Sequence, residues 1–268
     1  MTTDEVAYGW AGSAGGPVTV VLHGGGPGCH STSDFGAVMR ARPDRRWLWV
    51  DLPGFGRSPR RAPTAHPLAD AAGALAGLLD RLGLDRVDIL AQSLGGSVAL
   101  QLGADRPASV RRIVAIGSQP TPDPGGRAGL PRDPDLGARA RAGYYGGTGP
   151  SLAKMRALVT ELEWYDHDLV PSGLVSDRHG AGSTDTALAT ADGSRPEDLG
   201  VHLGAVAAPT LVMWGRHDPF AGPEYAAALA DALPRGDLAV VARTAHHPQS
   251  ERPGIVAALA LAFFTDRS

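Results

Sequence analysis

The sequence predicts an α/β fold built on a mostly parallel sheet, and three observations support this. Several short β-rich runs end at loops of small or polar residues. Helical stretches separate most of these runs. The runs are continuously apolar rather than alternating, which is typical of parallel strands buried on both faces. Because ligands of such sheets gather beyond the carboxyl ends of the strands, we expect the chemistry in the loops at that edge.

The predicted elements alternate along most of the chain. The strands are Val18–Leu22, Trp47–Asp51, Val87–Ala91, Ile113–Gly117, Thr210–Trp214 and Leu238–Val241. The helices are Leu68–Leu82, Leu94–Ala104, Pro223–Leu233 and Gly254–Phe264. This alternation of strands and helices stops between about Gln119 and Leu203.

The interrupting stretch begins with a run rich in proline and glycine, which by itself fits a disordered insertion. From Ser151 to Tyr165, however, apolar residues recur close to helical spacing. We therefore predict a mainly helical cap over the sheet, residues 119–203, which we call the cap segment. The core then consists of residues 1–118 and 204–268.

Composition and charge are those of an ordinary globular protein. Of its 268 residues, 43% are hydrophobic and 20% are charged, and the formal net charge of −3 gives no basic surface for nucleic acid. No run reaches the ~18 apolar residues of a membrane span, and the N-terminus lacks the pattern of a signal peptide. The single cysteine, Cys29, cannot form an internal disulfide, so we expect a cytoplasmic protein.

The strongest local motif is Ala91–Gly96 (A-Q-S-L-G-G), between a predicted strand and a predicted helix. A serine on such a sharp turn stands above the sheet at a helix N-terminus, and small neighbours let strand and helix approach each other. The usual motif is G-x-S-x-G, and Ala91 here replaces the first glycine. Ser93 is therefore the candidate nucleophile, in preference to Cys29. The alternative is a serine that only caps the helix.

A second motif, His23–Gly28 (H-G-G-G-P-G), follows the first predicted strand. Consecutive glycines let backbone N–H groups approach a ligand without side chains in the way. We expect the N–H groups of Gly25 and of Leu94, the residue after the serine, to hold a developing oxyanion. A phosphate-binding loop is the alternative, but the run has neither G-x-G-x-x-G spacing nor a following G-K-S/T.

Two further candidates follow the last two predicted strands. Asp218 lies in the loop after Thr210–Trp214, and His246 lies in the loop after Leu238–Val241. A serine hydroxyl needs a base to take its proton, and the base needs an acid that fixes its tautomer. The order serine, acid, histidine at three strand ends therefore predicts a triad of Ser93, Asp218 and His246.

These motifs together resemble the α/β-hydrolase superfamily over nearly the whole chain. The segment Asp51–Ser58 has the superfamily's D-x-P-G-x-G-x-S pattern, and the C-terminal motif reads as its G-H-x-P-x-x-E-x-P pattern with Ala245 for glycine. The resemblance implies an eight-stranded-type sheet and a base at His246. His247 is the alternative base.

Within the superfamily, the glycine run is similar to that of the meta-cleavage-product hydrolases, which cleave a carbon–carbon bond in products of catechol ring-opening. The resemblance implies a substrate site formed by Gly24, Gly26, Gln92, Arg178 and His247. Arg178 corresponds to a cap arginine of that family, whose planar fork suits a carboxylate. Arg178 as a solvated cap residue is the alternative. Gln92 and His247 replace the family's usual asparagine and tryptophan.

The expected function is cofactor-free hydrolysis at the carbonyl of a small molecule, with a 2-hydroxy-6-oxo-dienoate-like compound as the carbon–carbon substrate. The departures at Gln92 and His247 leave a carboxylesterase or lactonase of specialised metabolism as an alternative. A small-molecule receptor with this fold is a further alternative, whereas a non-catalytic interaction module leaves the ordered triad unexplained. His167, His179 and His202 have no metal-binding spacing. The resemblance also allows a homo-oligomer.

Overall fold

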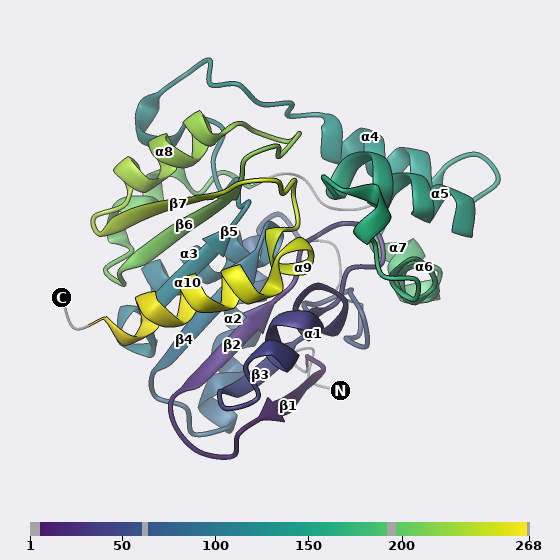
Figure 1. Cartoon of the computed structure of the whole chain (residues 1–268). Coiled ribbons are helices and arrows are strands. Elements are labelled where there is room, and N and C mark those ends of the chain that lie inside the picture. Colours follow the sequence, from purple (N-terminus) through teal and green to yellow (C-terminus); the bar gives the residue numbers. More distant parts are fainter. Residues whose placement is uncertain (1–5, 61–63, 192–196, 267–268) are drawn as a thin grey trace.

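The computed structural model describes residues 6–60, 64–191 and 197–266, and a single mostly parallel sheet runs through them (Figure 1). Its strands stand in the order β1-β3-β2-β4-β5-β6-β7. Their bounds are β1 Tyr8–Gly12, β2 Val18–Leu22, β3 Arg46–Val50, β4 Val87–Gln92, β5 Val110–Ile116, β6 Thr210–Gly215 and β7 Gly236–Val241. Only the β1–β3 pair is antiparallel among these strands. The predicted fold class is thus confirmed.

Helices cover both faces of this sheet. Figure 1 shows α1 and α10 on one face, and α2, α3 and α8 on the other. Their bounds are α1 Ser31–Ala41, α2 Pro67–Arg81, α3 Leu94–Asp105, α8 Pro223–Ala232 and α10 Pro253–Thr265, with a short α9 at Pro248–Glu251. Neighbouring strand residues such as Val20 and Val21 belong to the two opposite cores. Since side chains alternate across a strand, both faces demand apolar residues, which explains the continuous apolar runs.

Strand β1 and helices α1 and α9 of the core were not predicted. The described part of the chain contributes seven strands to this sheet, for which the resemblance implied an eight-stranded type. The edge strand β1 has a partly exposed, weakly apolar sequence, so it lacks the signal of a buried strand. Helix α1 is rich in Ser, Thr and Gly, and is instead fixed by a capping box at His30 and by burial of Phe35 and Val38.

The cap segment is mainly helical, as predicted. It contains η2 Pro124–Gly126, α4 Leu136–Tyr145, α5 Leu152–Ala157, η3 Leu158–Glu163, η4 His167–Leu169, α6 Leu174–Gly182 and α7 Asp185–Ala191, and η5 Gly200–Ala205 overlaps its end. Figure 1 shows α4 to α7 gathered beyond one end of the sheet. They share a small core of their own that includes Tyr144, Met155 and Trp164. By contrast, η2 and η5 pack against α8 and α3 of the core.

The amphipathic stretch from Ser151 to Tyr165 forms a helix in two parts. Ser151 caps α5, because its hydroxyl accepts a hydrogen bond from the Lys154 N–H. The following turn, η3, is a π-helix, a rare form that is frequent at functional sites. The wider turn ends at Glu163, whose side chain is buried although glutamate is normally solvated. The local winding of the cap segment thus directs a carboxylate inward.

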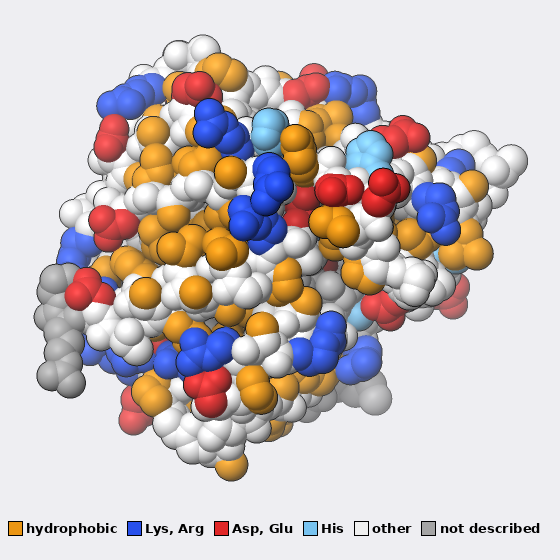
Figure 2. Space-filling view, viewed as in Figure 1, with side chains coloured by type: hydrophobic (Ala, Val, Ile, Leu, Met, Phe, Trp, Pro, Cys, Tyr) orange, Lys and Arg blue, Asp and Glu red, His pale blue; other side chains and the backbone are white. Residues whose placement is uncertain are grey.

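A group of exposed apolar side chains lies at the β7 edge of the sheet. Leu238 and Val240 of β7, with Ile255 and Leu259 of α10, are each more than one-third exposed, and Figure 2 shows hydrophobic atoms over these elements. In the described part of the chain, no helix is long and apolar enough to cross a membrane.

Candidate active site

Ser93 occupies a strained turn between β4 and α3. Its backbone has φ 47° and ψ −113°, a positive φ that is costly for any residue except glycine. Its N–H donates to the carbonyl of Ile116 at 2.7 Å, which ties the turn to β5. A Cβ at Gly95 would lie 2.5 Å from the Leu22 carbonyl oxygen, and one at Gly96 would lie 1.8 Å from Ser118 Oγ. Both glycines are therefore required for the close approach that presents the serine.

Asp218 and His246 form a buried pair at the carboxyl ends of the neighbouring strands. His246 Nδ1 lies 2.8 Å from Asp218 Oδ2, and the Phe220 N–H donates to Asp218 Oδ1 at 2.9 Å. Since a carboxylate only accepts, Nδ1 carries the proton and Nε2 is left to act as a base. Burial opposes protonation of His246, but the charge and hydrogen bond of Asp218 outweigh it, so the pKa of His246 is raised.

Three close contacts place this pair beside Ser93. A Cβ at Gly117, the residue after β5, would lie 3.2 Å from His246 Nδ1 and 3.3 Å from Asp218 Oδ2. The Gln92 side-chain amide donates to the His246 carbonyl at 3.1 Å. The structure records no hydrogen bond between the described side chains of Ser93 and His246, and in unliganded enzymes such bonds often tighten only with substrate. The structure thus pairs His246 with Asp218 next to Gln92, the residue before Ser93, and the role of the three residues as a triad stays a prediction.

The glycine loop, residues 23–28, is held against the turn at Ser93. A Cβ at Gly25 would lie 3.1 Å from Leu94 Cδ2, so the two predicted oxyanion donors are neighbours. His23 Nδ1 lies 2.7 Å from the Gly24 carbonyl oxygen, and the Leu52 N–H donates to His23 Nε2 at 2.8 Å. The Gly24 carbonyl and the Gly25 N–H belong to one trans peptide bond and therefore point in opposite directions. The contact between His23 and the Gly24 carbonyl thus also fixes the direction of the Gly25 N–H.

Two buried side chains that sequence reasoning missed hold this loop. Burial lowers the pKa of His23, and the neutral ring has the donor and acceptor that its two contacts require. Asp34 of α1 accepts a hydrogen bond from the Gly24 N–H at 2.9 Å. The position of His23 at the start of the glycine run was a usable signal. Asp34 had none, because it belongs to a helix that was not predicted.

Arg178 lies at the seam between the cap segment and the glycine loop, not in solvent. Its side chain is 2% exposed and forms a bidentate ion pair with Glu163, whose side chain is 4% exposed. Its Nη2 and Nε also donate to the Pro27 carbonyl, at 2.8 and 3.3 Å. The alternative of a solvated cap residue is therefore wrong. The sequence predicted that Arg178 binds a carboxylate of the substrate. In this structure the carboxylate that pairs with Arg178 belongs to Glu163.

The other residues assigned to substrate binding surround this seam. A Cβ at Gly26 would meet Arg178 Nη2 at 3.1 Å and Glu163 Oε1 at 3.2 Å, and one at Gly24 would meet Gln92 Oε1 at 2.0 Å. Gln92 Oε1 has no hydrogen-bond partner among the described residues. These positions thus adjoin the triad and the loop, whereas their contact with a substrate stays a prediction.

The side chain of His247 contacts Gln249 and Glu163. Its Nδ1 accepts from the Gln249 amide at 3.2 Å, and its Nε2 lies 3.5 Å from Glu163 Oε2. Burial lowers the pKa of His247 to about 3, so the ring is neutral. Asp218 therefore orients His246, whereas the acid beside His247, Glu163, is already paired with Arg178. Among the described residues, no cluster of His, Cys, Asp or Glu could hold a metal ion.

Comparison with known proteins agrees with this architecture. The profile of the α/β hydrolase fold family matches residues 18–253. The chain is 30% identical to a 2-hydroxy-6-oxononadienedioate/2-hydroxy-6-oxononatrienedioate hydrolase of Dechloromonas aromatica, over 97% of this chain and 91% of that one. It is also 30% identical to a 2-hydroxymuconate semialdehyde hydrolase of a Pseudomonas species, over 92% and 86%.

A solved structure shows the same fold. The 2-hydroxy-6-oxo-6-phenylhexa-2,4-dienoate hydrolase of a Rhodococcus species superposes with a TM-score of 0.79, at 24% identity over 97% of this chain and 95% of that one. The chain is therefore a member of the α/β-hydrolase fold family and is similar, within it, to the meta-cleavage-product hydrolases.

Proposed function

We propose that this hydrolase cleaves its substrate at a carbonyl through Ser93, His246 and Asp218. The observation that carries the proposal is the 2.8 Å contact between His246 and Asp218 beside a strained Ser93 turn. In this mechanism His246 Nε2 takes the Ser93 proton while Oγ attacks the carbonyl carbon. The N–H groups of Gly25 and Leu94 stabilise the resulting oxyanion, and Asp218 stabilises the imidazolium.

Collapse of the tetrahedral intermediate then expels the leaving group, which takes the proton from His246. An acyl group remains on Ser93. A water molecule gives a proton to His246 and attacks the acyl carbon, which releases the acid and restores the serine. Relatives named for 2-hydroxy-6-oxo-dienoate-type substrates support a carbon–carbon bond as the bond cleaved. In that case ketonisation of the dienol comes first, because a carbanion leaves only when its charge is delocalised.

The proposal extends to the surroundings of the site. Residues 119–203 act as its cap, and the buried Arg178–Glu163 pair supports this by joining the cap segment to the glycine loop. The single cysteine supports a cytoplasmic location. The exposed apolar residues of β7 and α10 are compatible with a homo-oligomer.

The test compares turnover by wild type and Ser93→Ala of a 2-hydroxy-6-oxo-dienoate and of a simple p-nitrophenyl ester. We expect Ser93→Ala to lower kcat by at least ~10³ with either substrate. Ester turnover alone would move the assignment to an esterase or lactonase. Slow turnover together with ligand-induced thermal stabilisation would favour a receptor. Full activity in a folded Ser93→Ala protein, free of contaminating esterase, would rule out the mechanism.

A further inference from the structure

The cap segment brings a second arginine to the glycine loop. Arg141 of α4 donates from Nη2 to the carbonyl of Gly25 at 2.6 Å. Gly25 is the predicted oxyanion donor that packs against Leu94. Arg141 is therefore connected, through a single hydrogen bond, with the loop that faces the candidate nucleophile.

The two cap arginines differ in how many of their N–H donors are engaged and in whether a carboxylate pairs with them. Four hydrogen bonds to Glu163 and Pro27 engage Arg178, out of the five N–H donors of a guanidinium. Arg141 has one hydrogen bond, and no carboxylate forms an ion pair with it among the described residues. A substrate carboxylate would have to displace a buried glutamate from Arg178, leaving that glutamate without its partner. A substrate carboxylate could bind Arg141 without displacing another carboxylate from it.

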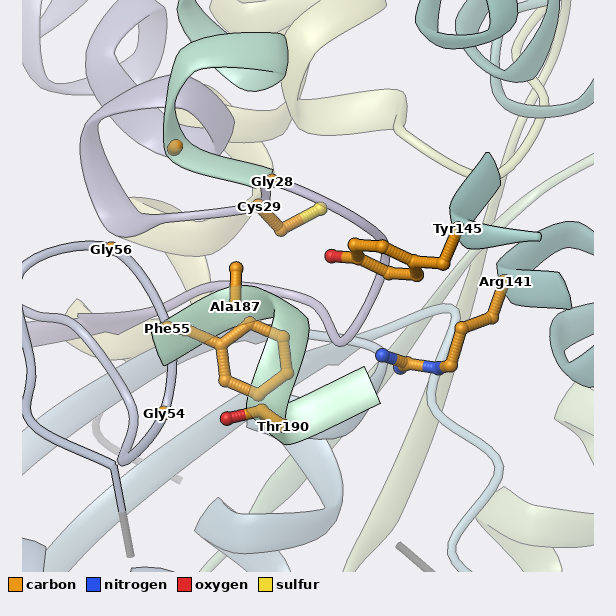
Figure 3. Close-up of a pocket in the computed structure, with 10 residues that line it drawn as sticks. Gly28, Cys29, Gly54, Phe55, Gly56, Arg141, Tyr145, Ala187 and Thr190 are labelled. Carbon is orange, nitrogen blue, oxygen red and sulfur yellow. The ribbon is translucent and has the colours of Figure 1, made fainter. Parts of the chain in front are cut away.

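Arg141 also lines a cavity beneath the cap segment. This small cavity of about 10 Å³, which has room for about one water molecule and opens to solvent, lies between the cap segment and the glycine loop. Figure 3 shows the Arg141 guanidinium and the Tyr145 hydroxyl pointing into it, opposite Cys29 and Phe55. Burial raises the pKa of Tyr145 to about 12, so the phenol stays protonated and can donate. None of the lining residues is acidic.

We propose that Arg141 and Tyr145 bind the anionic end of the substrate in this cavity, which would make Arg141 the specificity-determining arginine in place of Arg178. The inference rests on the proposed function, since it assumes that the carbonyl reacts at Ser93. Arginine and tyrosine lie four positions apart on α4, so both donors project from one face of the helix. A carboxylate or enolate oxygen pair suits the guanidinium fork, and Phe55 and Ala187 are apolar neighbours in the lining of the same cavity.

The kinetic test uses a matched pair of substrates, mono-p-nitrophenyl adipate and the neutral p-nitrophenyl hexanoate. Arg141→Ala should lower the ratio of kcat/KM for the anionic over the neutral ester by about tenfold or more, mainly through KM. Tyr145→Phe should lower it by a smaller factor. Arg139→Ala is the control, because Arg139 lies on the same helix but is exposed and pairs with Asp133. It should leave the ratio unchanged.

A binding measurement separates this inference from the proposed function. Calorimetry with adipate and Ser93→Ala protein reports anion binding without turnover, with Arg141 intact and with Arg141→Ala or Arg141→Lys added. Adipate binding that weakens about tenfold when Arg141→Ala is added supports the site even if no ester is hydrolysed. An unchanged ratio and unchanged adipate affinity in a folded Arg141→Ala protein would overturn it. So would a loss confined to Arg178→Ala, or an absence of adipate binding in every variant.

Discussion

Arg178 and Arg141 both reach from the cap segment to the glycine loop, but their surroundings give them opposite roles. Arg178 is sealed in the seam with a carboxylate that the chain itself provides, and its hydrogen bonds join Glu163 to Pro27. Arg141 is half-buried, faces the cavity and keeps most of its donors free. A paired buried charge holds two parts of a protein together, whereas an unpaired one at a cavity is available to a ligand.

Glu163 is the residue that makes the two regions different. Its carboxylate neutralises Arg178, and its backbone carbonyl accepts a hydrogen bond from the His246 N–H at 3.2 Å. A single residue of the π-helix therefore contacts the arginine that holds the glycine loop and the loop that carries the candidate base. The seam thus positions the glycine loop and the loop that carries His246, whereas the cavity is the proposed site for recognising the substrate anion.

The largest expected effect is on stability. Glu163→Ala should lower the free energy of unfolding by about 3–5 kcal/mol, because it leaves a buried guanidinium without its carboxylate. Arg141→Ala should cost much less, since Arg141 is half-buried and unpaired among the described residues. Urea unfolding measures both changes. The control is Glu161→Ala, an exposed glutamate of the same turn, which should stay within about 0.5 kcal/mol of wild type. Equal losses for Glu163 and Glu161 would contradict the sealed seam.

The next largest expected effect is on the pH dependence of kcat/KM, which should change in a seam variant but not in a cavity variant. His246 acts as a base only when neutral. Burial lowers its pKa, but the charges of Asp218 and Glu163 raise it above the ordinary value, so activity should rise with pH through a limb above about 6.5. Glu163→Gln removes one of these charges and should move the limb to lower pH. Arg141→Ala should leave the limb in place. A limb that Glu163→Gln does not move would mean that the seam has no electrostatic effect on the base.

The smallest expected effect concerns Cys29, which adjoins both regions. Its Sγ would lie 3.2 Å from a Cβ at Gly26, and the residue also lines the cavity. Burial raises the pKa of the Cys29 thiol well above its ordinary value, so a disulfide reagent such as DTNB should label the native protein slowly. Glu163→Ala should speed labelling by loosening the seam, more than Arg139→Ala does. Rapid labelling of wild type would indicate that the cap segment opens readily.

Local sequence was most informative where a motif and an element boundary coincide. Ser93, Asp218 and His246 each follow a strongly apolar strand, so their common edge could be inferred from the order of the strands alone. The same strands identified the sheet, whereas β1 and α1 escaped because neither carries a continuous apolar signal. Resemblance selected Arg178 as a cap arginine, and the structure places it against Pro27 of the glycine loop and pairs it with Glu163. Its partner Glu163 could not be anticipated, because an isolated glutamate on an amphipathic helix is normally solvated.

The sequence by itself determined the parallel sheet, the strand-end positions of the candidate triad and the helical character of the cap segment. It did so because apolar periodicity and glycine requirements are local properties of the chain. Only the tertiary structure decided which arginine is neutralised and which faces the cavity. That outcome depends on how a π-helix, α4 and α6 dock on the glycine loop, and it joins residues such as Arg178 and Pro27 that lie far apart in the sequence. Burial and pairing of charges arise from such packing, which no local pattern encodes.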